Sequence, residues 1–272
     1  MTGGLGWQLV CELLLLGAFT GLLAGLLGIG GGMLMVPFMT MLLSARAVPA
    51  PYVLKTAVAT SLATIVFTSI SSVRAHHARG AVRWDIVRWL APGIVVGSLI
   101  GAQITKALPT ALLAFVFAGF VGFSATQMLL NRQPAANRQL PGRAGMLGAG
   151  GLIGTLAALV GAGGGFVSVP FMTTHNVKIH NAVATSAALG FPIALAGTLG
   201  YVIAGWSIHD MPPGAVGFIY LPALIAISVA SVLTAPLGAR LAHRMDVRQL
   251  RRVFALLLYA LAAYMLYRAI AG

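Results

Sequence analysis

The chain has 272 residues, of which 59% are hydrophobic and only 8% are charged. Because soluble domains carry about 25% charged residues, this composition excludes a soluble globular protein. The formal net charge of +13 would suggest nucleic-acid binding in a soluble protein. In membrane proteins, however, basic residues collect in cytoplasmic loops and contact anionic lipid. The composition therefore predicts an all-α polytopic membrane protein, with the lipid bilayer and not nucleic acid as its partner.

The predicted elements fall into two similar series. In the first, an apolar stretch, a glycine break and a short segment precede three helices: 7–27, 28–32, 33–44, 54–72, 86–105 and 110–130. The corresponding segments of the second series are 145–160, 161–165, 166–173, 182–204, 215–239 and 249–268. Most helices have the length of roughly 20 residues that crosses a bilayer. We therefore expect a first transmembrane repeat over 1–130, a cytoplasmic linker over 131–144 and a second transmembrane repeat over 145–272.

Two five-residue strings each occur twice. Val-Pro-Phe-Met-Thr begins at Val36 and again at Val169, and Ala-Val-Ala-Thr-Ser begins at Ala57 and again at Ala182. Each copy of the first string follows one of the glycine breaks. The chain is thus an internal duplication. Interrupted apolar segments at matching positions of two repeats are the best sequence indication of a transporter binding site.

The distribution of Lys and Arg distinguishes two topologies for the broken segments. If each segment crossed the membrane once, the 17 basic residues would divide eight against nine, which gives no bias. If each segment is a re-entrant hairpin, thirteen share one side, and the other four, Arg46, Lys55, Lys106 and Arg268, lie opposite. The second division fits the positive-inside rule. We therefore expect six full spans and two re-entrant hairpins.

Three crossings per repeat is an odd number, so the second repeat is expected to be inverted, with both termini outside. The basic loop 73–85 then lies inside, and its counterpart 205–214, without Lys or Arg, lies outside. The four tryptophans divide as an aromatic belt would: Trp84 and Trp89 inside, Trp7 and Trp206 outside. The stretch 7–27 is long enough to cross alone, and the first hairpin is wrong if it does so.

The glycine breaks are the first candidate for a binding site. Glycine runs interrupt a helix, and irregular backbone at membrane depth is tolerated where it lines a cavity. The helix that follows points its N-terminus at the cavity and attracts anions. Proline suits the first turn of such a helix, which begins either at the proline or a few residues earlier. Tight helix packing is the alternative explanation of the glycines. The candidates are Gly28, Gly30, Gly31, Gly32 and Pro37, and Gly161, Gly163, Gly164, Gly165 and Pro170.

Two hydroxyl pairs, Thr60-Ser61 and Thr185-Ser186, lie about two turns into the helices that follow the hairpins. Their hydroxyls can donate to an oxyanion without adding charge. Alternatively, they bond to the backbone of their own helix, as Ser and Thr often do in membranes. Identical pairs in inverted repeats are expected to converge on the pseudo-twofold axis, beside the two helix N-termini.

Three further polar residues are candidates for supporting roles. Glu12 is the acidic residue inside an apolar stretch, which makes it a candidate for proton coupling unless it lies shallow enough to reach water. Lys55 and Asn181 lie just before the two hydroxyl helices. We expect them at a vestibule that draws in anions, with anchoring at the membrane interface as the alternative.

The sequence offers no pattern for metal or covalent chemistry. The single cysteine, Cys11, excludes an intramolecular disulfide and a cysteine-rich metal site. His76 and His77 are adjacent rather than at metal-ligand spacing. A catalytic Ser/His/Asp, Cys/His or paired-carboxylate arrangement is not visible. We therefore expect a protein that is not an enzyme and that uses no metal and no cofactor.

Small residues also recur at a spacing of four, which lets helix backbones approach closely. The pairs are Gly21/Gly25, Gly97/Gly101 and Gly150/Gly154. Packing inside one subunit is one interpretation of these pairs. The face of a homodimer is the other.

The glycine break, the Val-Pro-Phe-Met string and the Ala-Thr-Ser helix, all duplicated, resemble the TauE/SafE family, the sulfite exporter or toluene-sulfonate uptake permease family. The resemblance covers essentially the whole chain, with hallmark segments at 25–40 and 158–173. It implies an inner-membrane transporter of sulfite, organosulfonates or related sulfur anions, in a family that moves substrates in either direction. The family motif falls on Gly28 to Pro37 and Gly161 to Pro170, where Ile29 against Ala162 makes the two halves of a site unequal.

We therefore expect a secondary transporter that exports a small sulfur oxyanion by alternating access. A site of backbone donors and hydroxyls, with little fixed charge, suits an anion that must bind and then leave. An anion channel and a non-transporting membrane scaffold or sensor are the alternatives.

Overall fold

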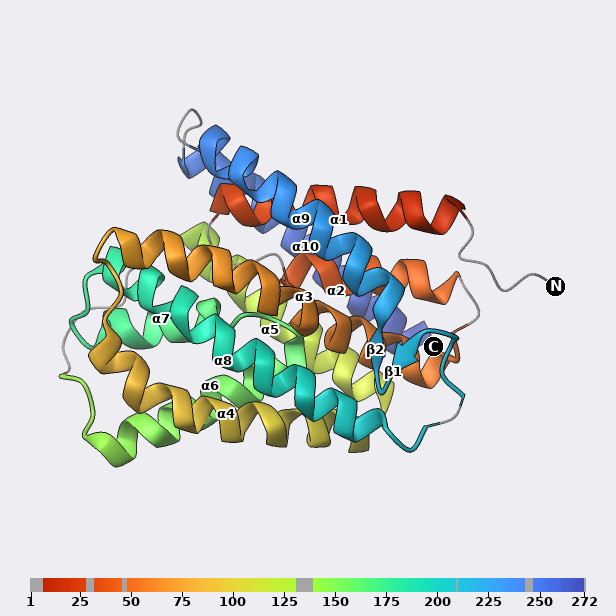
Figure 1. The fold of residues 1–272 in the computed structure, drawn as a ribbon, viewed down its shortest axis with the longest axis horizontal. Coiled ribbons are helices and arrows are strands. Elements are labelled where there is room, and N and C mark those ends of the chain that lie inside the picture. The colour runs from red at the N-terminus through yellow and green to blue at the C-terminus, as the bar shows by residue number, and fades with distance from the viewer. Residues whose placement is uncertain are drawn as a thin grey trace.

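The computed structural model describes residues 7–27, 32–45, 48–130, 139–208, 210–242 and 247–271. The first half of the chain contains α1 (Trp7–Leu27), α2 (Gly32–Ser44), α3 (Ala50–Ala78), α4 (Trp84–Ala107) and α5 (Thr110–Leu130). The second half contains α6 (Arg143–Val160), α7 (Gly165–Thr174), α8 (Ile179–Gly205), β1 (Ala215–Val216), β2 (Ile219–Tyr220), α9 (Leu221–Ala242) and α10 (Val247–Ala271) (Figure 1).

Each predicted helical segment is a helix in the structure, and most ends lie within a few residues of the predicted ones. The largest extension is α3, which covers Ala50–Ala78 where the sequence predicts 54–72. The prediction of helix over 215–220 is wrong, because these residues contain the antiparallel strands β1 and β2. Gly217 explains the difference, since its φ of 57° is left-handed and does not continue a right-handed helix.

Seven helices among the described residues are long and apolar enough to cross a membrane: α3, α4, α5, α6, α8, α9 and α10. By length and composition, α6 belongs to this group although the sequence assigns it to a hairpin. The described side chains of α1, from Trp7 to Leu23, and those of α2 form shorter apolar stretches. This pattern is that of a multi-pass membrane protein.

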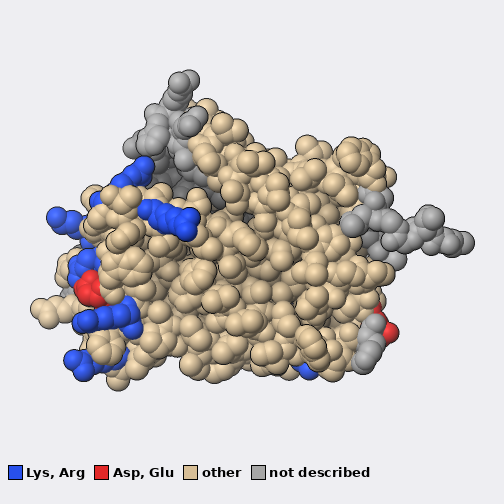
Figure 2. Space-filling model, viewed as in Figure 1, with Lys and Arg blue, Asp and Glu red and all other residues tan. Residues whose placement is uncertain are grey.

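The long helices run along the length of the molecule, so that the loops gather at two ends (Figure 1). The α3–α4 and α7–α8 loops lie at one end, which we call the basic end because Lys and Arg gather there (Figure 2). The β1–β2 hairpin, the start of α1 and the end of α10 lie at the other, the terminal end. By their places on these elements, the described residues of the basic end include Arg74, Arg79, Arg83, Arg88, Arg143 and Lys178.

The two halves of the chain pack against each other in a reciprocal way. The first helix of each half packs along the penultimate helix of the other, α1 on α9 and α6 on α4. Likewise α3 contacts α9 while α8 contacts α4, and the pairs α3–α8 and α5–α10 join corresponding helices. Each half therefore completes the helix packing of the other.

Glycines allow the backbones at these interfaces to touch. A Cβ added to Gly97 would collide with the carbonyl of Gly151, and one added to Gly154 would collide with that of Ile94. At the reciprocal interface, a Cβ on Gly21 would collide with the backbone of α9. The interpretation of these glycines as packing positions inside one subunit is thus confirmed.

Candidate functional site

The second glycine break reverses the chain between α6 and α7. Gly161 ends α6 in the left-handed conformation (φ 68°), and its N–H and that of Ala162 both donate to the carbonyl of Ala157. Gly164 is also left-handed (φ 73°) and directly precedes α7. Because other residues rarely adopt this conformation, the chain needs glycine at these two positions.

The start of α2 lies against this second break. Gly32 is buried, and a Cβ added to it would lie 2.5 Å from the carbonyl oxygen of Gly161 and 3.2 Å from the Cα of Ala162. The end of the first break and the start of the second therefore meet with backbone against backbone. The candidates Gly28, Gly30 and Gly31 lie outside the described residues.

Ser61 contacts both broken segments at this place, which we call the central junction (Gly32, Ser61, Gly161 and Ala162). The side chain of Ser61 is fully buried on α3, and its hydroxyl donates to the carbonyl of Gly161 at 2.9 Å, with the carbonyl of Gly32 at 3.3 Å. A hydroxyl has a single proton. In this conformation that proton is committed to backbone carbonyls.

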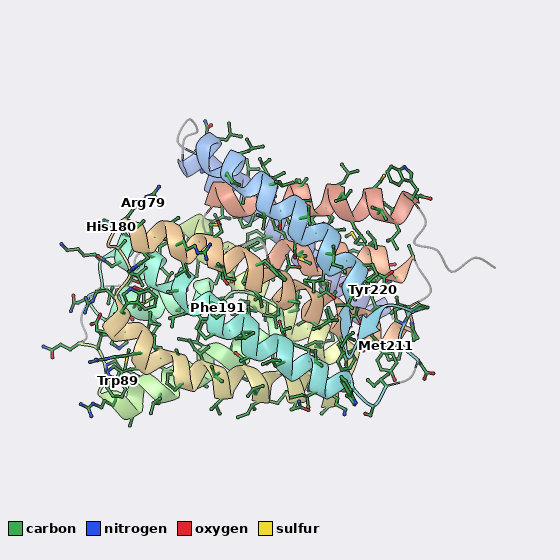
Figure 3. The ribbon with its side chains drawn as sticks, in the orientation of Figure 1. Arg79, Trp89, His180, Phe191, Met211 and Tyr220 are labelled. Carbon is green, nitrogen blue, oxygen red and sulfur yellow. The ribbon has the colours of Figure 1, made fainter. Side chains whose placement is uncertain are left out.

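The short helices α2 and α7 begin near the central junction and diverge from it. At the far end of α2, the hydroxyl of Ser44 accepts a hydrogen bond from Arg268 of α10 at 2.7 Å, so α2 runs to the terminal end. Helix α7 ends at Thr174, shortly before His180, which lies at the basic end (Figure 3). Both helix N-termini, with their partial positive charge, therefore face the interior of the molecule.

The two prolines lie in the second turn of these helices, and the sequence leaves open whether each helix begins at its proline or a few residues earlier. Pro37 is the sixth residue of α2, which begins at Gly32, and Pro170 is the sixth residue of α7, which begins at Gly165. Each proline removes the helical hydrogen bond to the carbonyl four residues earlier, because it has no N–H. The helices begin before the prolines because the last glycine of each break is already helical.

Thr60 and Thr185 make the same kind of contact in the two halves. The Oγ1 of Thr60 on α3 accepts from the backbone N–H of Tyr220 at 3.1 Å, and the Oγ1 of Thr185 on α8 accepts from that of Arg83 at 3.0 Å. Tyr220 directly precedes α9, and Arg83 directly precedes α4. Each threonine is fully buried and binds a loop from the other half of the chain.

The hydroxyl pairs do not converge on one point, so that expectation is wrong. Helices α3 and α8 are neighbours that run in opposite directions (Figure 1), with Gly197 against Leu62. Thr60 then lies level with Leu199, which is fourteen positions beyond Thr185 on α8. At 1.5 Å per residue the two threonines are about 20 Å apart along the helices.

Ser186 has a different partner from Ser61. The hydroxyl of Ser168 on α7 donates to that of Ser186 at 2.8 Å, and both side chains are buried. Ser168 stands two residues before the proline of the second string, where the first half has Met35. The two halves are therefore chemically unequal next to their short helices.

Lys55 and Asn181 make their contacts outside the central junction. The buried Lys55 donates from Nζ to the carbonyl of Lys106 at the end of α4, at 2.8 Å. The side chain of Asn181 donates to the carbonyl of Ala81 in the α3–α4 loop, also at 2.8 Å. Because these contacts are at opposite ends of the molecule, Lys55 and Asn181 do not line one vestibule. Glu12 is half-buried on α1, the helix that packs along α9.

Two glycines outside the breaks help to form the threonine contacts, and the sequence does not predict this role. Gly80 (φ 64°) and Gly217 (φ 57°) are both left-handed, and each stands four positions before a helix, α4 or α9. The N–H that reaches a threonine belongs to the third residue after each glycine. The matched spacing was a signal, but a weak one, because the three residues between glycine and helix share no identity in the two halves.

The chain is similar to known proteins over nearly its whole length. The family described as Sulfite exporter TauE/SafE matches residues 13–265. The chain is 37% identical over 254 residues to "Probable membrane transporter protein" of Haemophilus influenzae, covering 93% of this chain and 96% of that protein. It is 27% identical over 234 residues to "Probable membrane transporter protein YdhB" of Bacillus subtilis, covering 83% and 87%. No solved structure matches the chain.

The matched region contains the central junction, both short helices and both threonine helices. These relatives are named as transporters and not as enzymes. The chain therefore belongs to the TauE/SafE family of membrane transporters.

Proposed function

We propose that the protein is a secondary transporter that exports sulfite, organosulfonates or related small sulfur oxyanions by alternating access. The observation that carries the proposal is the central junction, where α2 begins against the second break and Ser61 contacts both segments. Two helix N-termini facing the interior offer N–H donors and partial positive charge to a small anion. The choice of a sulfur oxyanion rests on the family relationship.

The polar groups of the core suit an anion that must also leave. Most buried polar side chains that the structure describes are Ser and Thr; the others include Lys55 near the terminal end and Tyr201, whose hydroxyl donates to Thr105 and to the carbonyl of Ala158. Backbone N–H groups and hydroxyls can bind an oxyanion without a fixed charge, whereas a buried arginine would hold it tightly or need a counter-ion. We therefore place the substrate at the central junction, with Ser61 exchanging its carbonyl partner for the anion.

We further propose that α1–α2 and α6–α7 are re-entrant hairpins in inverted repeats. The start of α1 and the end of α2 lie at the terminal end, whereas the start of α6 and the end of α7 lie at the basic end (Figure 1). This placement and the reciprocal helix contacts support the proposal. The positive-inside rule then puts the basic end in the cytoplasm and both termini outside the inner membrane.

Three candidates from the sequence keep supporting roles in this proposal. Glu12, an acidic residue within the apolar helix α1, is assigned to proton coupling. Lys55 contributes positive charge at the terminal end, where an exported anion leaves. Asn181 positions the α3–α4 loop at the opposite end.

Flux measurements on purified protein in proteoliposomes test the proposal. Vesicles loaded with sulfite or methanesulfonate are expected to show saturable efflux that accelerates when the same anion is added outside. Ser61→Ala is expected to slow this flux roughly tenfold, the effect of losing one buried hydrogen bond. Ser124→Ala is the matched control, because this buried serine donates to Phe120 of its own helix.

Three results would count against the proposal. Folded wild-type protein that moves neither anion would contradict it directly. Equal flux in wild type and Ser61→Ala would remove the central junction as the binding site. Steady single-channel currents without exchange would favour an anion channel.

A further inference from the structure

Two loops connect the halves of the chain through matched backbone hydrogen bonds. We call them the basic latch (residues 80–83, bound to Thr185) and the terminal latch (residues 217–220, bound to Thr60) after the ends of the molecule at which they lie. Tyr220 marks the terminal latch in Figure 3, and Arg79, just before the basic latch, lies at the opposite end. In each latch the donor is a main-chain N–H and the acceptor is a threonine of the other half.

A left-handed glycine turns each loop toward its threonine. In the basic latch, Gly80 and Ala81 cap the end of α3 through bonds from their N–H groups to the carbonyls of His77 and His76. In the terminal latch, Gly217 lies so close to α8 that an added Cβ would be 2.6 Å from the carbonyl of Val202. Both loops therefore have a defined backbone path, which aims one N–H at a buried hydroxyl.

The two latches are held by different additional contacts. The basic latch has a second bond, from the amide of Asn181, one turn before Thr185, to the carbonyl of Ala81. The position equivalent to Asn181 is Thr56, and its buried hydroxyl has no partner in the described structure. In the terminal latch, the N–H of Phe218 donates to the carbonyl of Tyr201 at 3.4 Å. The ring of Phe218 also packs against the rings of Tyr52 and Tyr201, with centroids 6.1 and 6.2 Å away.

The second glycine break lies between the latches along the α3–α8 pair. The carbonyl of Gly163 would be 3.7 Å from a Cβ on Gly190 of α8, and Ser69 of α3 would be 3.8 Å from it. Along α3, Ser69 lies beyond Thr60, and along α8, Gly190 lies beyond Thr185. An anion beside Gly163 therefore has one latch on each side of it, whereas Ser61 of the central junction lies next to Thr60 of the terminal latch.

We infer that the two latches are the two gates of the transport cycle, each opening the central junction toward its own end while the other stays closed. This inference rests on the proposed alternating-access function. The halves are joined by two neutral hydrogen bonds at the basic latch and by one at the terminal latch. Each such bond contributes only about 0.5–1.5 kcal/mol, which is too little to keep a gate permanently closed. Relative movement of the halves can therefore break one latch without breaking the other.

Site-directed labelling without substrate tests the inference. In a Cys11→Ser background, Ile219→Cys reports on the terminal latch and Val82→Cys on the basic latch, since both side chains are buried. Each reporter is combined with Thr60→Val or Thr185→Val in proteoliposomes, and the rate of reaction with a membrane-impermeant maleimide is measured from both sides. Valine keeps the size of threonine and removes the hydrogen-bond acceptor.

Thr60→Val is expected to raise the labelling rate of Ile219→Cys about two- to tenfold, the effect of one hydrogen bond, without raising that of Val82→Cys. Thr185→Val is expected to do the reverse. Thr64→Val is the control, because its buried hydroxyl donates to the carbonyl of Thr60 within α3 and should change neither rate.

The inference is overturned if both reporters respond to both variants, if neither responds, or if Thr64→Val acts like Thr60→Val. Because labelling needs no substrate, the outcome is separate from the flux assay. Wild-type flux together with unselective labelling would reject the gates and leave the transport function standing. Selective labelling in a protein without sulfur-anion flux would reject that substrate class alone.

Discussion

The hydroxyl of Ser61 donates to the carbonyl oxygen of Gly161, 100 positions later in the chain, at a distance of 2.9 Å. The same hydroxyl lies 3.3 Å from the carbonyl of Gly32. One serine of the first half therefore contacts two interrupted segments that belong to different halves, beside the direct backbone contact of Gly32 with Gly161. Any movement of one half against the other has to change this contact, which is the property that a binding site with alternating access requires.

Alanine substitutions in the second break should separate glycines that the backbone needs from one that it does not. Gly161→Ala would place a Cβ at a φ of 68° and 2.9 Å from the side chain of Val36. We expect it to lower the free energy of unfolding by about 1–3 kcal/mol. Gly163→Ala, whose Cβ would meet Ile65 at an ordinary 3.7 Å, should change it by less than about 0.5 kcal/mol. Thermal unfolding in detergent compares the two, and equal midpoints would contradict the assignment.

Alanine substitutions should likewise distinguish a glycine packed between α4 and α6 from a glycine with open space around it. Gly97→Ala puts a methyl group into the backbone of Gly151, so we expect a loss of at least about 1–3 kcal/mol and poor recovery of folded protein. Gly119→Ala on α5 has open space around the new Cβ and should be neutral or slightly stabilising. The monodisperse fraction in size-exclusion chromatography measures both. A stable Gly97→Ala protein would show that the interface can relax.

Sided cysteine labelling should test the two hairpins. In a Cys11→Ser protein, Ala45→Cys follows α2 and Lys178→Cys precedes α8, and both positions are exposed. We expect a membrane-impermeant maleimide to reach Ala45→Cys from the outside and Lys178→Cys from the cytoplasm. Ala78→Cys, at the exposed end of α3, is the cytoplasmic reference. Labelling of the first two positions from the same side would exclude the inverted hairpins.

Replacement of Lys55 should affect substrate capture rather than turnover. Lys55→Gln removes a positive charge near the terminal end and the bond from Nζ to the carbonyl of Lys106. We expect KM for external sulfite in exchange assays to rise severalfold with kcat nearly unchanged, because the interaction precedes binding at the central junction. Lys106→Gln removes an exposed charge from the same end and serves as the control. An equal fall in kcat in Lys55→Gln would instead indicate a role in the transport step.

The broken helices could be predicted from sequence because their signals are local. Runs of glycine interrupt an apolar stretch whatever surrounds them, and the repeated strings show that the interruption occurs twice. The structure places helices on both sides of the second break, and Gly161 and Gly164 have the left-handed angles that explain it. The position of Pro37 and Pro170 within the second turn was beyond such reasoning, because helix starts are uncertain by several residues.

The partners of the hydroxyl pairs could not be predicted, because they depend on the relative positions of α3 and α8 along their axes. The same letters, Ala-Val-Ala-Thr-Ser, place Ser61 against a backbone carbonyl and Ser186 against another serine. The threonines bind loops that carry no repeated letters, since backbone N–H groups make the contact and any residue can supply one. The reciprocal pattern consists of the two threonine hydrogen bonds, and the repeated strings do not predict it.

The packing of α1 along α9 constrains the order in which the fold can be completed during synthesis. Helix α1 ends at Leu27, and α9 begins at Leu221, so the ribosome adds most of the chain before the final neighbour of α1 exists. Until then, the glycine face of α1 at Gly17 and Gly21 has only lipid or the insertion machinery to cover it. Such long-range pairing is slow and exposes incomplete chains to misassembly. A chain truncated before α9 therefore leaves this face of α1 without its protein neighbour, however well α1–α8 have inserted.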